Sequence, residues 1–378
     1  DRFCRENAVL DASGERHKGV LSGADMAGWR ATFEDPLTLD YHGHTVCKCG
    51  PWSQGPALLQ SLALLAEVDV AAMDPLGPDF VHTVTECMKL SYADREAWYG
   101  DPDFVDVPVD DLLSKAYADE RRALVGDRAS LDLRPGAPGG RAPRLADFIT
   151  EGRTVIPMVA GAGEPTVARY GSTDDDPGTR PDGGTRGDTC HIDIIDRWGN
   201  MVSATPSGGW LQSSPLIPEL GFALGSRAQM FWLEEGLPAS LAPGKRPRTT
   251  LTPSFVLRGG EAWMPFGTPG GDQQDQWQLI MLLRHLHHGL NLQEAIDIPS
   301  FHTEHFPSSF YPRAARAGVL VMEGRWNADV VTELRRRGHE VEVGLDWSEG
   351  RLTAAKKEDG LLKAAANPRG MQGYAVGR

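Results

Sequence analysis

The feature that most constrains the fold is an abrupt change of sequence pattern near residue 188. Residues 161–188 are rich in Gly, Pro, Asp, Thr and Arg and contain few apolar side chains. Such a segment buries too little apolar surface to join a core, so we expect a mobile linker there. Directly after it, apolar and polar residues alternate over 191–195 and again over 201–205. This period of two predicts a pair of short strands, joined by a hairpin-like turn at 197–200.

The rest of the chain mixes helical and extended patterns. With 378 residues and 40% hydrophobic content, it can bury a large core in one big domain or two ordinary ones. Apolar periodicity and capping residues predict helices at 54–70, 80–98, 274–288 and 328–337, and a helix that begins at Asp110 and Asp111. Strands are predicted at 41–49 and 319–322, with a strand pair around Asp359-Gly360. Hairpins rather than strict strand–helix–strand units indicate an α+β fold.

The charge balance argues against two classes of partner. The net charge is −14 and the isoelectric point is near 5.2, whereas nucleic acids and anionic membranes attract basic surfaces. We therefore expect neither nucleic acid nor membrane as a partner. No apolar run approaches the ~20 residues of a membrane span. The chain begins at Asp1 rather than Met, so we expect the natural start, and any leader, to lie further upstream.

The cysteines and histidines predict neither a disulfide framework nor a metal site. Five cysteines are an odd number spread thinly over a long chain, which indicates reduced thiols and favours the cytoplasm over the periplasm. One cluster could attract a metal, but its Cys-x-Cys spacing is tighter than in structural zinc sites and a strand explains it more simply: His42, His44, Cys47 and Cys49. A second group fits the last turn of a helix, where cations meet the negative dipole end: His285, His287 and His288. We expect no cofactor, and a metal hydrolase built on the first cluster stays an alternative that metal content would reveal.

Thr189 is the candidate nucleophile on chemical grounds. It stands between the linker and the first predicted strand. Cleavage of the Asp188–Thr189 bond would give Thr189 a free α-amine beside its hydroxyl, which supplies nucleophile and general base from one residue. A threonine that merely opens a strand after an ordinary surface loop is the alternative. Cys190 is the stronger nucleophile but would lack the terminal amine, and we expect its side chain to face the core.

Several separated blocks of sequence resemble the gamma-glutamyltranspeptidase family of N-terminal nucleophile hydrolases. They follow one another in the family's order and span nearly the whole chain. Those in the first half resemble the large subunit: YHGHTV at 41–46, ADR at 93–95 and GDPDF at 100–104. Those in the second half resemble the small subunit: GDTCHIDIIDRWGN at 187–200, NMVSAT at 200–205, GKRPRTTLTP at 244–253, GTPGG at 267–271 and NPR at 367–369.

The resemblance implies an αββα sandwich, in which two stacked sheets are covered by helices. Residues 1–188 would form the large-subunit part, N-terminally incomplete and ending in the linker, and residues 189–378 the small-subunit part of one intertwined domain. The resemblance also implies self-cleavage. Thr189 would attack the carbonyl of Asp188 through its Oγ, form an ester that water opens, and then serve as the catalytic nucleophile.

The resemblance assigns supporting roles to five further residues. Gly270 and Gly271 match the oxyanion-hole pair, where glycines let backbone N–H groups approach the substrate. Thr249 and Thr250 stand where relatives place a serine pair that binds the substrate's carboxylate. Ser207 stands where a second threonine supports the nucleophile. Local backbone hydrogen bonding in turns is the alternative for these three hydroxyl-bearing residues.

Departures from the family pattern bear on the substrate. Relatives hold the glutamyl α-amino group with an Asn, a Gln and an Asp, and the matching positions here are Gly209, Arg227 and Met230. A buried ammonium without a carboxylate partner is costly, so a free γ-glutamyl amine is disfavoured. Arg227 would favour a carboxylate through a forked contact, unless it forms a surface or structural ion pair instead. Asp272 or Asp275 could restore the acidic contact.

We expect an N-terminal threonine amidohydrolase or acyltransferase that acts through an acyl-enzyme on a small carboxylate-bearing amide. Gamma-glutamyl transfer or glutathione hydrolysis is the alternative activity. A non-catalytic binding protein that keeps the fold and never matures is the alternative of another class. The expected partner is a small-molecule amide, and the processed subunits would assemble as a homodimer or a heterotetramer.

Overall fold

The computed structural model describes residues 1–10, 15–152, 189–208, 215–225, 227–310, 313–369 and 373–377. The predicted linker at 161–188, Asp188 and Gly209 lie outside these described residues. The expectations stated for them therefore stay predictions.

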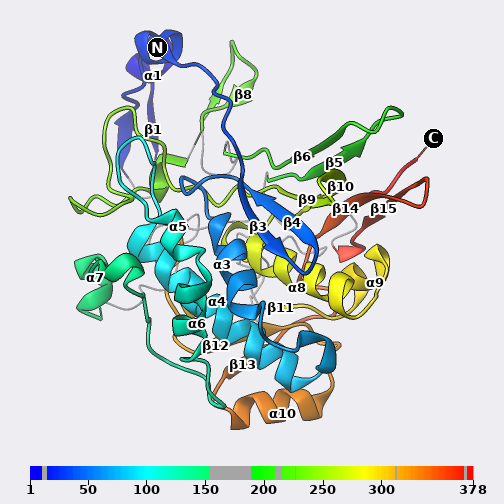
Figure 1. Ribbon diagram of the computed structural model, residues 1–378. Helices are drawn as coiled ribbons and strands as arrows, with labels where there is room; N and C mark the ends of the chain where they lie inside the picture. Colours follow the sequence, from blue (N-terminus) through cyan, green and yellow to red (C-terminus); the bar gives the residue numbers. More distant parts are fainter. Residues whose placement is uncertain are drawn as a thin grey trace.

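A six-stranded antiparallel sheet forms the centre of the molecule (Figure 1). Its strand order is β15-β14-β10-β9-β4-β3. The strands are β3 Leu37–Tyr41, β4 His44–Lys48, β9 Ser254–Arg258, β10 Glu261–Gly267, β14 Thr353–Glu358 and β15 Leu361–Ala366. β3 and β4 precede Thr189 in sequence and the other four follow it. The β4–β9 ladder, in which Val46 stands opposite Val256, therefore joins the two halves of the chain.

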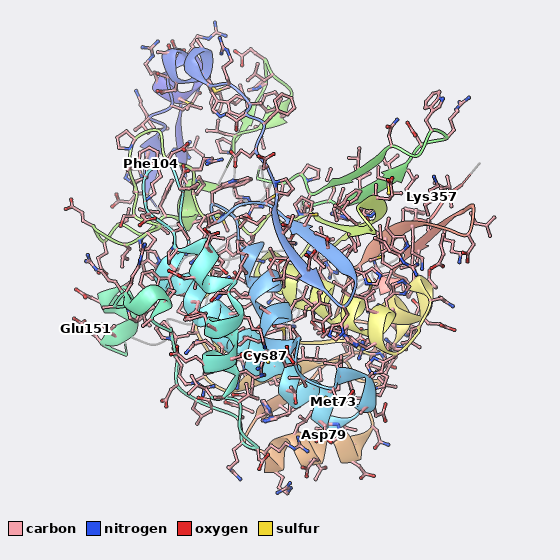
Figure 2. The ribbon with its side chains drawn as sticks, in the orientation of Figure 1. Met73, Asp79, Cys87, Phe104, Glu151 and Lys357 are labelled. Carbon is pink, nitrogen blue, oxygen red and sulfur yellow. The ribbon has the colours of Figure 1, made fainter. Side chains whose placement is uncertain are left out.

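Helices cover one face of this sheet. α3 (Pro56–Leu65) and α8 (Gln274–His287) lie against the strands, and α4 (Pro78–Trp98) packs on α3 (Figure 1). All ten residues of α3 are buried, which suits its run of Leu and Ala side chains. Cys87 on α4 lies inside this layer (Figure 2) and is fully buried. No helix in the described ranges combines the length and the apolar character needed to cross a bilayer.

A β-hairpin covers the opposite face. It consists of β5 (Ile192–Ile195) and β6 (Met201–Ala204) and contacts β10 and β14. On β14, Thr353 bonds Asp193 of this hairpin, whereas Lys356, three residues on, bonds His285 of α8, so the two layers occupy opposite faces. The order helices, sheet, second β layer confirms the predicted α+β class and provides three layers of the implied αββα sandwich.

The remaining elements surround these layers. A smaller three-stranded sheet holds β11 Phe301–Thr303, β12 Val319–Met322 and β13 Glu340–Val343 in that order. The other helices are α1 Arg2–Glu6, α2 Gly23–Gly28, α5 Val109–Leu112, α6 Lys115–Arg122, α7 Asp147–Thr150, α9 Leu292–Asp297 and α10 Ala328–Arg336. The other strands are β1 Ala8–Leu10, β2 Arg16–Lys18, β7 Leu216–Ile217 and β8 Phe222–Ala223.

Two local expectations are wrong in part. Residues 41–49 are not one strand, because β3 ends at Tyr41 and β4 begins at His44. Between them His42 and Gly43 have φ of 45° and 78°, which close a tight hairpin that alternation alone does not reveal. The helix expected to begin at Asp110 is a single turn that begins at Val109. The longer α6 after it is capped by Ser114, which accepts the Tyr117 N–H.

Candidate active site

Thr189 leads into the hairpin and is largely buried, with 8% of its surface exposed. Its Oγ1 lies 2.7 Å from the Oγ of Ser207, which follows β6. The next backbone N–H, that of Cys190, donates to the carbonyl of Pro206 at 3.1 Å. The two ends of the hairpin thus bring Thr189 and Ser207 together, as the resemblance implies for a nucleophile and its supporting hydroxyl.

Arg227 extends this cluster. It begins the short 3₁₀ turn at Arg227–Met230 and is half-buried. Its guanidinium donates to Ser207 Oγ at 2.6 Å and to Thr250 Oγ1 at 3.4 Å, and it lies 5.8 Å from the centre of the Phe310 ring. Arg227 therefore points into the Thr189 site, and one side chain links two hydroxyls that sequence reasoning placed there separately.

The two threonines at 249 and 250 have different surroundings. Thr250 is fully buried and its hydroxyl faces Arg227. Thr249 forms a bridge with Ser53, and its own Oγ1 accepts the Leu251 N–H at 3.2 Å. Of the pair, Thr250 is linked to the Thr189 cluster, while the hydroxyl of Thr249 makes the local backbone contact that is typical of a turn.

Gly270 and Gly271 form the turn between β10 and α8. Their φ angles are 132° and 56°, which favour glycine, and a Cβ at Gly270 would lie 2.6 Å from the Trp277 ring. Among the described residues, neither backbone N–H has a hydrogen-bond acceptor. Two such donors just before the positive end of a helix dipole are what a developing oxyanion requires. The geometry of this turn is compatible with the role that the resemblance implies.

Asp272 holds this turn from the protein interior. Its carboxylate forms an ion pair with Arg95 and accepts from the N–H and Oγ of Ser309 at 2.8 and 2.6 Å. Although burial opposes ionisation, Arg95 and Ser309 hold the pKa of Asp272 below its usual range. Asp275 is also engaged, by Lys48 at 2.8 Å. Both carboxylates that could have received a substrate ammonium therefore have buried protein partners.

Sequence reasoning missed His191, which supports the strand that carries Thr189. Its Nε2–H donates to Asp193 at 2.9 Å, and its Nδ1 pairs with Thr205 Oγ1 at 2.7 Å. Asp193 also accepts from Thr353 Oγ1 at 2.8 Å. The ring packs so closely on Gly267 that a Cβ there would lie 2.2 Å away. The available signal was a His-x-Asp pair at the inward positions of a strand, where apolar residues are usual.

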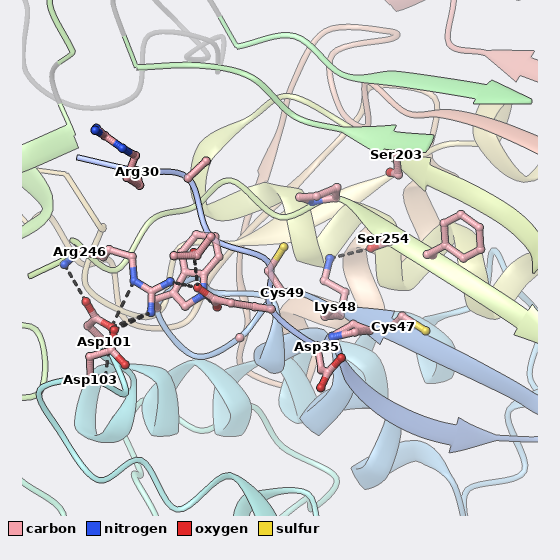
Figure 3. A pocket seen from close by; sticks show the side chains of 18 of the residues that line it. Arg30, Asp35, Cys47, Lys48, Cys49, Asp101, Asp103, Ser203, Arg246 and Ser254 are labelled. Carbon is pink, nitrogen blue, oxygen red and sulfur yellow. Dashed lines mark hydrogen bonds and ion pairs between the residues drawn. The ribbon is translucent and has the colours of Figure 1, made fainter. Parts of the chain in front are cut away.

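Contacts between the family-like blocks join the two halves of the chain. The backbone N–H of Arg246 donates to Oδ2 of Asp101 at 2.8 Å, and the guanidinium of Arg246 donates to Oδ1 of the same carboxylate at 2.8 Å. Figure 3 shows this pair at one end of a cavity of about 980 Å³, with Lys48 and Ser254, 2.6 Å apart, further in. Thr189, Ser207 and Arg227 are not among the residues that line this cavity.

One group of possible metal ligands occurs in the described part of the chain: His82, Glu86 and His339, all buried and with ligand atoms within 4.8 Å of one another. His82 and His339 bond each other at 2.8 Å, and Glu86 bonds Lys89 at 2.7 Å and Arg134 at 3.2 Å. Two cations beside the carboxylate oppose a third positive charge, so these bonds explain the cluster without a metal.

The side chain of Cys190 is exposed, contrary to the expectation that it faces the core. Thr189 and His191 on either side of it turn their side chains inward, and successive residues of an extended segment alternate between faces. An inward Thr189 therefore requires an outward Cys190.

Comparison with known proteins finds one family along nearly the whole chain. The family described as gamma-glutamyltranspeptidase matches residues 8–377. The Acylase ACY 1 proenzyme of Pseudomonas sp. (strain SE83) is 28% identical over 92% of this chain and 53% of its own length. The glutathione hydrolase-like YwrD proenzyme of Bacillus subtilis is 30% identical over 93% of this chain and 58% of its own length. The oxamate amidohydrolase proenzyme of Klebsiella pneumoniae is 29% identical over 93% of this chain and 57% of its own length. The chain thus spans about half the length of the curated relatives it matches.

Solved structures agree. Two structures of a protein called LmbA2991 are 55% identical, cover 100% of this chain and 61% of theirs, and superpose with TM-scores of 0.87 and 0.86. A cephalosporin acylase from Bacillus halodurans is 26% identical over 93% of this chain and 54% of its own, with a TM-score of 0.73. These likenesses confirm a fold of the N-terminal nucleophile hydrolase type. The chain belongs to the gamma-glutamyltranspeptidase family.

Proposed function

We propose that the protein is an autoprocessing N-terminal threonine amidohydrolase or acyltransferase that acts on a small amide bearing a carboxylate. The observation that carries this proposal is the position of Arg227, which bonds both Ser207, the partner of Thr189, and Thr250. A guanidinium beside the nucleophile favours an anionic group on the acyl part of the substrate. Asp272 and Asp275 do not offset it, because Arg95 and Lys48 hold them.

Maturation uses the same hydroxyl as catalysis. Thr189 Oγ attacks the carbonyl carbon of Asp188, the C–N bond between them breaks, and the nitrogen takes up the proton to become the α-amine of Thr189. Water then hydrolyses the resulting ester, which releases the Asp188 carboxylate and restores the Thr189 hydroxyl.

In turnover, the new α-amine accepts the proton of Thr189 Oγ as the oxygen attacks the substrate amide. An unperturbed α-amine has a pKa near 8, which suits this role near neutral pH. The Gly270 and Gly271 N–H groups donate to the oxyanion, and Ser207 bonds the nucleophilic oxygen. The leaving amine takes the proton, and water or an amine acceptor releases the acyl group from Thr189.

The names of the relatives support amide cleavage and leave the acyl group open. They are an acylase, an oxamate amidohydrolase and glutathione hydrolases. Oxamate carries a carboxylate directly beside its amide, which is the kind of substrate that Arg227 would favour.

The test uses the protein expressed from its full-length gene. Mass spectrometry should find a fragment that begins at Thr189, and Thr189→Ala should abolish both cleavage and turnover. Cys190→Ala, which changes an exposed neighbour, is the matched control and should preserve both. Turnover of oxamate and a glutaryl amide should exceed that of glutathione by about tenfold or more, the contribution expected of one charge-assisted contact.

Each rival has its own outcome. Glutathione turnover faster than that of the carboxylate amides would establish gamma-glutamyl transfer or hydrolysis in place of the proposed specificity. A full-length protein that stays uncut through prolonged incubation would identify a non-maturing binding protein. Cleavage and turnover that survive in Thr189→Ala would remove the proposed nucleophile.

A further inference from the structure

A second cavity, of about 530 Å³, lies where the helix layer meets the central sheet. Seven elements contribute polar or aromatic side chains to its lining: His44 from β4, Arg258 from β9, Trp263 from β10, His285 from α8, Gln293 from α9, Lys356 and Glu358 from β14, and Lys363 from β15. Trp263 and Gly267 are four residues apart on β10, or about 13 Å in a strand, and Gly270 lies beyond Gly267. The cavity therefore lies at the opposite end of β10 from the Gly270–Gly271 turn.

A β-bulge places Trp263 at this cavity. The register of β10 against β9 shifts between Ala262 and Met264, which leaves Trp263 as the additional residue. Bulges redirect a side chain and often occur beside functional sites. The indole is 7% exposed, and its N–H has no acceptor among the described residues.

Cations surround the indole. Lys356 Nζ lies 5.0 Å from the ring centre and the Arg258 guanidinium 5.7 Å. The His44 and His285 rings lie 4.8 and 5.7 Å away. Because these groups occupy the neighbourhood of the ring, the site suits a compact anion better than a stacked aromatic ligand.

Hydrogen bonds hold Lys356 in its buried position. His285 Nδ1–H donates to the Leu290 carbonyl at 2.6 Å, so its Nε2 is free to accept from Lys356 Nζ at 3.1 Å. Burial lowers the pKa of His285, which keeps the ring neutral and able to accept. Lys356 is 4% exposed, and this bond orients its side chain.

The charges in the cavity do not cancel. Arg258, Lys356 and Lys363 face a single carboxylate, Glu358, which bonds Lys356 at 3.0 Å and Lys363 at 2.7 Å. The lining therefore carries an excess of positive charge on a protein whose net charge is −14. In a partly desolvated cavity this excess attracts anions more strongly than the same charges would in water.

We infer that this cavity binds a small multivalent oxyanion, with phosphate or carboxylate groups, through Lys356 and Arg258. The site is distinct from the Thr189 cluster and does not depend on the proposed amidohydrolase activity. Glu358 competes with the anion for Lys356 and Lys363 and so limits its affinity.

Isothermal titration of the full-length protein with inorganic pyrophosphate and with citrate, at constant ionic strength, tests the inference. Arg258→Gln and Lys356→Met should each weaken binding about tenfold or more, the effect of losing one charge-assisted contact. Lys357→Met is the matched control, because Lys357 is exposed on the opposite face of β14, and it should bind as the unaltered protein does. Glu358→Gln should tighten binding severalfold, a gain that misfolding cannot imitate.

Binding of pyrophosphate alone assigns a phosphate-bearing ligand, binding of citrate alone a polycarboxylate, and either supports the site. The inference is overturned when neither probe binds, or when Arg258→Gln binds as well as Lys357→Met. Arg258 is exposed, so this comparison stands even where the buried Lys356→Met does not fold. Turnover at Thr189 should be unchanged in Arg258→Gln, which separates this result from the test of the proposed function.

Discussion

The hydroxyls of Thr189 and Ser207 are 2.7 Å apart and share one hydrogen bond. The Arg227 guanidinium, which can only donate, also bonds Ser207 Oγ at 2.6 Å. Ser207 Oγ therefore accepts from Arg227, and in its bond with Thr189 either hydroxyl can be the donor. If Thr189 is the nucleophile, as proposed, a bond donated by Ser207 would stabilise negative charge on Thr189 Oγ during the attack.

Removing the Ser207 hydroxyl should slow catalysis without unfolding the protein. We expect Ser207→Ala to lower kcat by about 10- to 100-fold, the usual effect of one lost hydrogen bond of 1–3 kcal/mol. Ser207→Thr keeps the hydroxyl and should keep most of the rate. Single-turnover kinetics measures both, and equal rates in the two variants would contradict the role given to this hydroxyl.

Arg227 should determine affinity for a substrate carboxylate. Arg227→Met should raise KM for the carboxylate amide by about tenfold or more. Arg227→Lys should raise KM less, because lysine keeps the positive charge but cannot form the two parallel hydrogen bonds of a guanidinium. Arg197→Met, in the exposed turn of the β5–β6 hairpin, is the control. Steady-state kinetics decides, and an unchanged KM in Arg227→Met would assign Arg227 a structural role.

Gly270→Ala should disable the oxyanion turn. The new Cβ would lie 2.6 Å from Trp277 at a φ of 132°, so the turn must move and its N–H groups with it. Losing one oxyanion donor typically lowers kcat by about 10²–10³-fold. Gly260 also has a positive φ, of 82°, but a Cβ there would have no neighbour within 4 Å. Gly260→Ala should therefore lower stability and leave kcat unchanged. Measurement of kcat and of thermal unfolding for both variants separates the two effects.

Asp272→Asn should affect stability rather than substrate binding. The change leaves the buried Arg95 without part of its ion pairing, which costs about 3–5 kcal/mol for such pairs. Urea unfolding should show this loss, and the folded fraction should keep its KM. Normal stability with a raised KM for an amine-bearing substrate would instead restore Asp272 as a substrate contact.

His302 should make stability fall at alkaline pH. Although burial opposes its protonation, Glu349 at 2.6 Å and Glu304 raise the pKa of His302 to about 9. A raised folded pKa stabilises the fold fully below the unfolded value near 6.5, and this contribution of about 3 kcal/mol is lost as pH rises to 9. Unfolding measured from pH 6 to 10 should show the decline, and His302→Gln should lack it. Parallel curves of unfolding free energy against pH for the unaltered protein and His302→Gln would rule out this contribution of His302.

Local patterns predicted the elements whose period is regular. The hairpin at 191–205 and the helices α4, α8 and α10 lie close to their expected ranges. Neither β9 nor β10 was predicted. In β10, Pro265 and the bulge at Trp263 interrupt the alternation of apolar and polar residues. Both strands are central, so the layout of the main sheet could not be inferred from the pattern alone.

The candidate site was predicted in its residue types more than in its contacts. Thr189 was predicted from the chemistry of a free amine beside a hydroxyl, and an oxyanion role for Gly270 and Gly271 from a family resemblance; both roles stay predictions. The contact of Arg227 with Ser207 and the burial of Asp272 by Arg95 both join residues far apart in sequence. No local pattern shows whether a carboxylate faces a substrate or a distant buried guanidinium.

The ladder between β4 and β9 would give the proposed self-cleavage at Thr189 an unusual outcome. These strands precede and follow the Asp188–Thr189 bond, so a cut there leaves two polypeptides that share one continuous set of backbone hydrogen bonds. Either polypeptide produced alone would present an open strand edge, which readily recruits other chains into aggregates. If the chain is cleaved as proposed, we therefore expect both pieces to fold from one precursor before the cut.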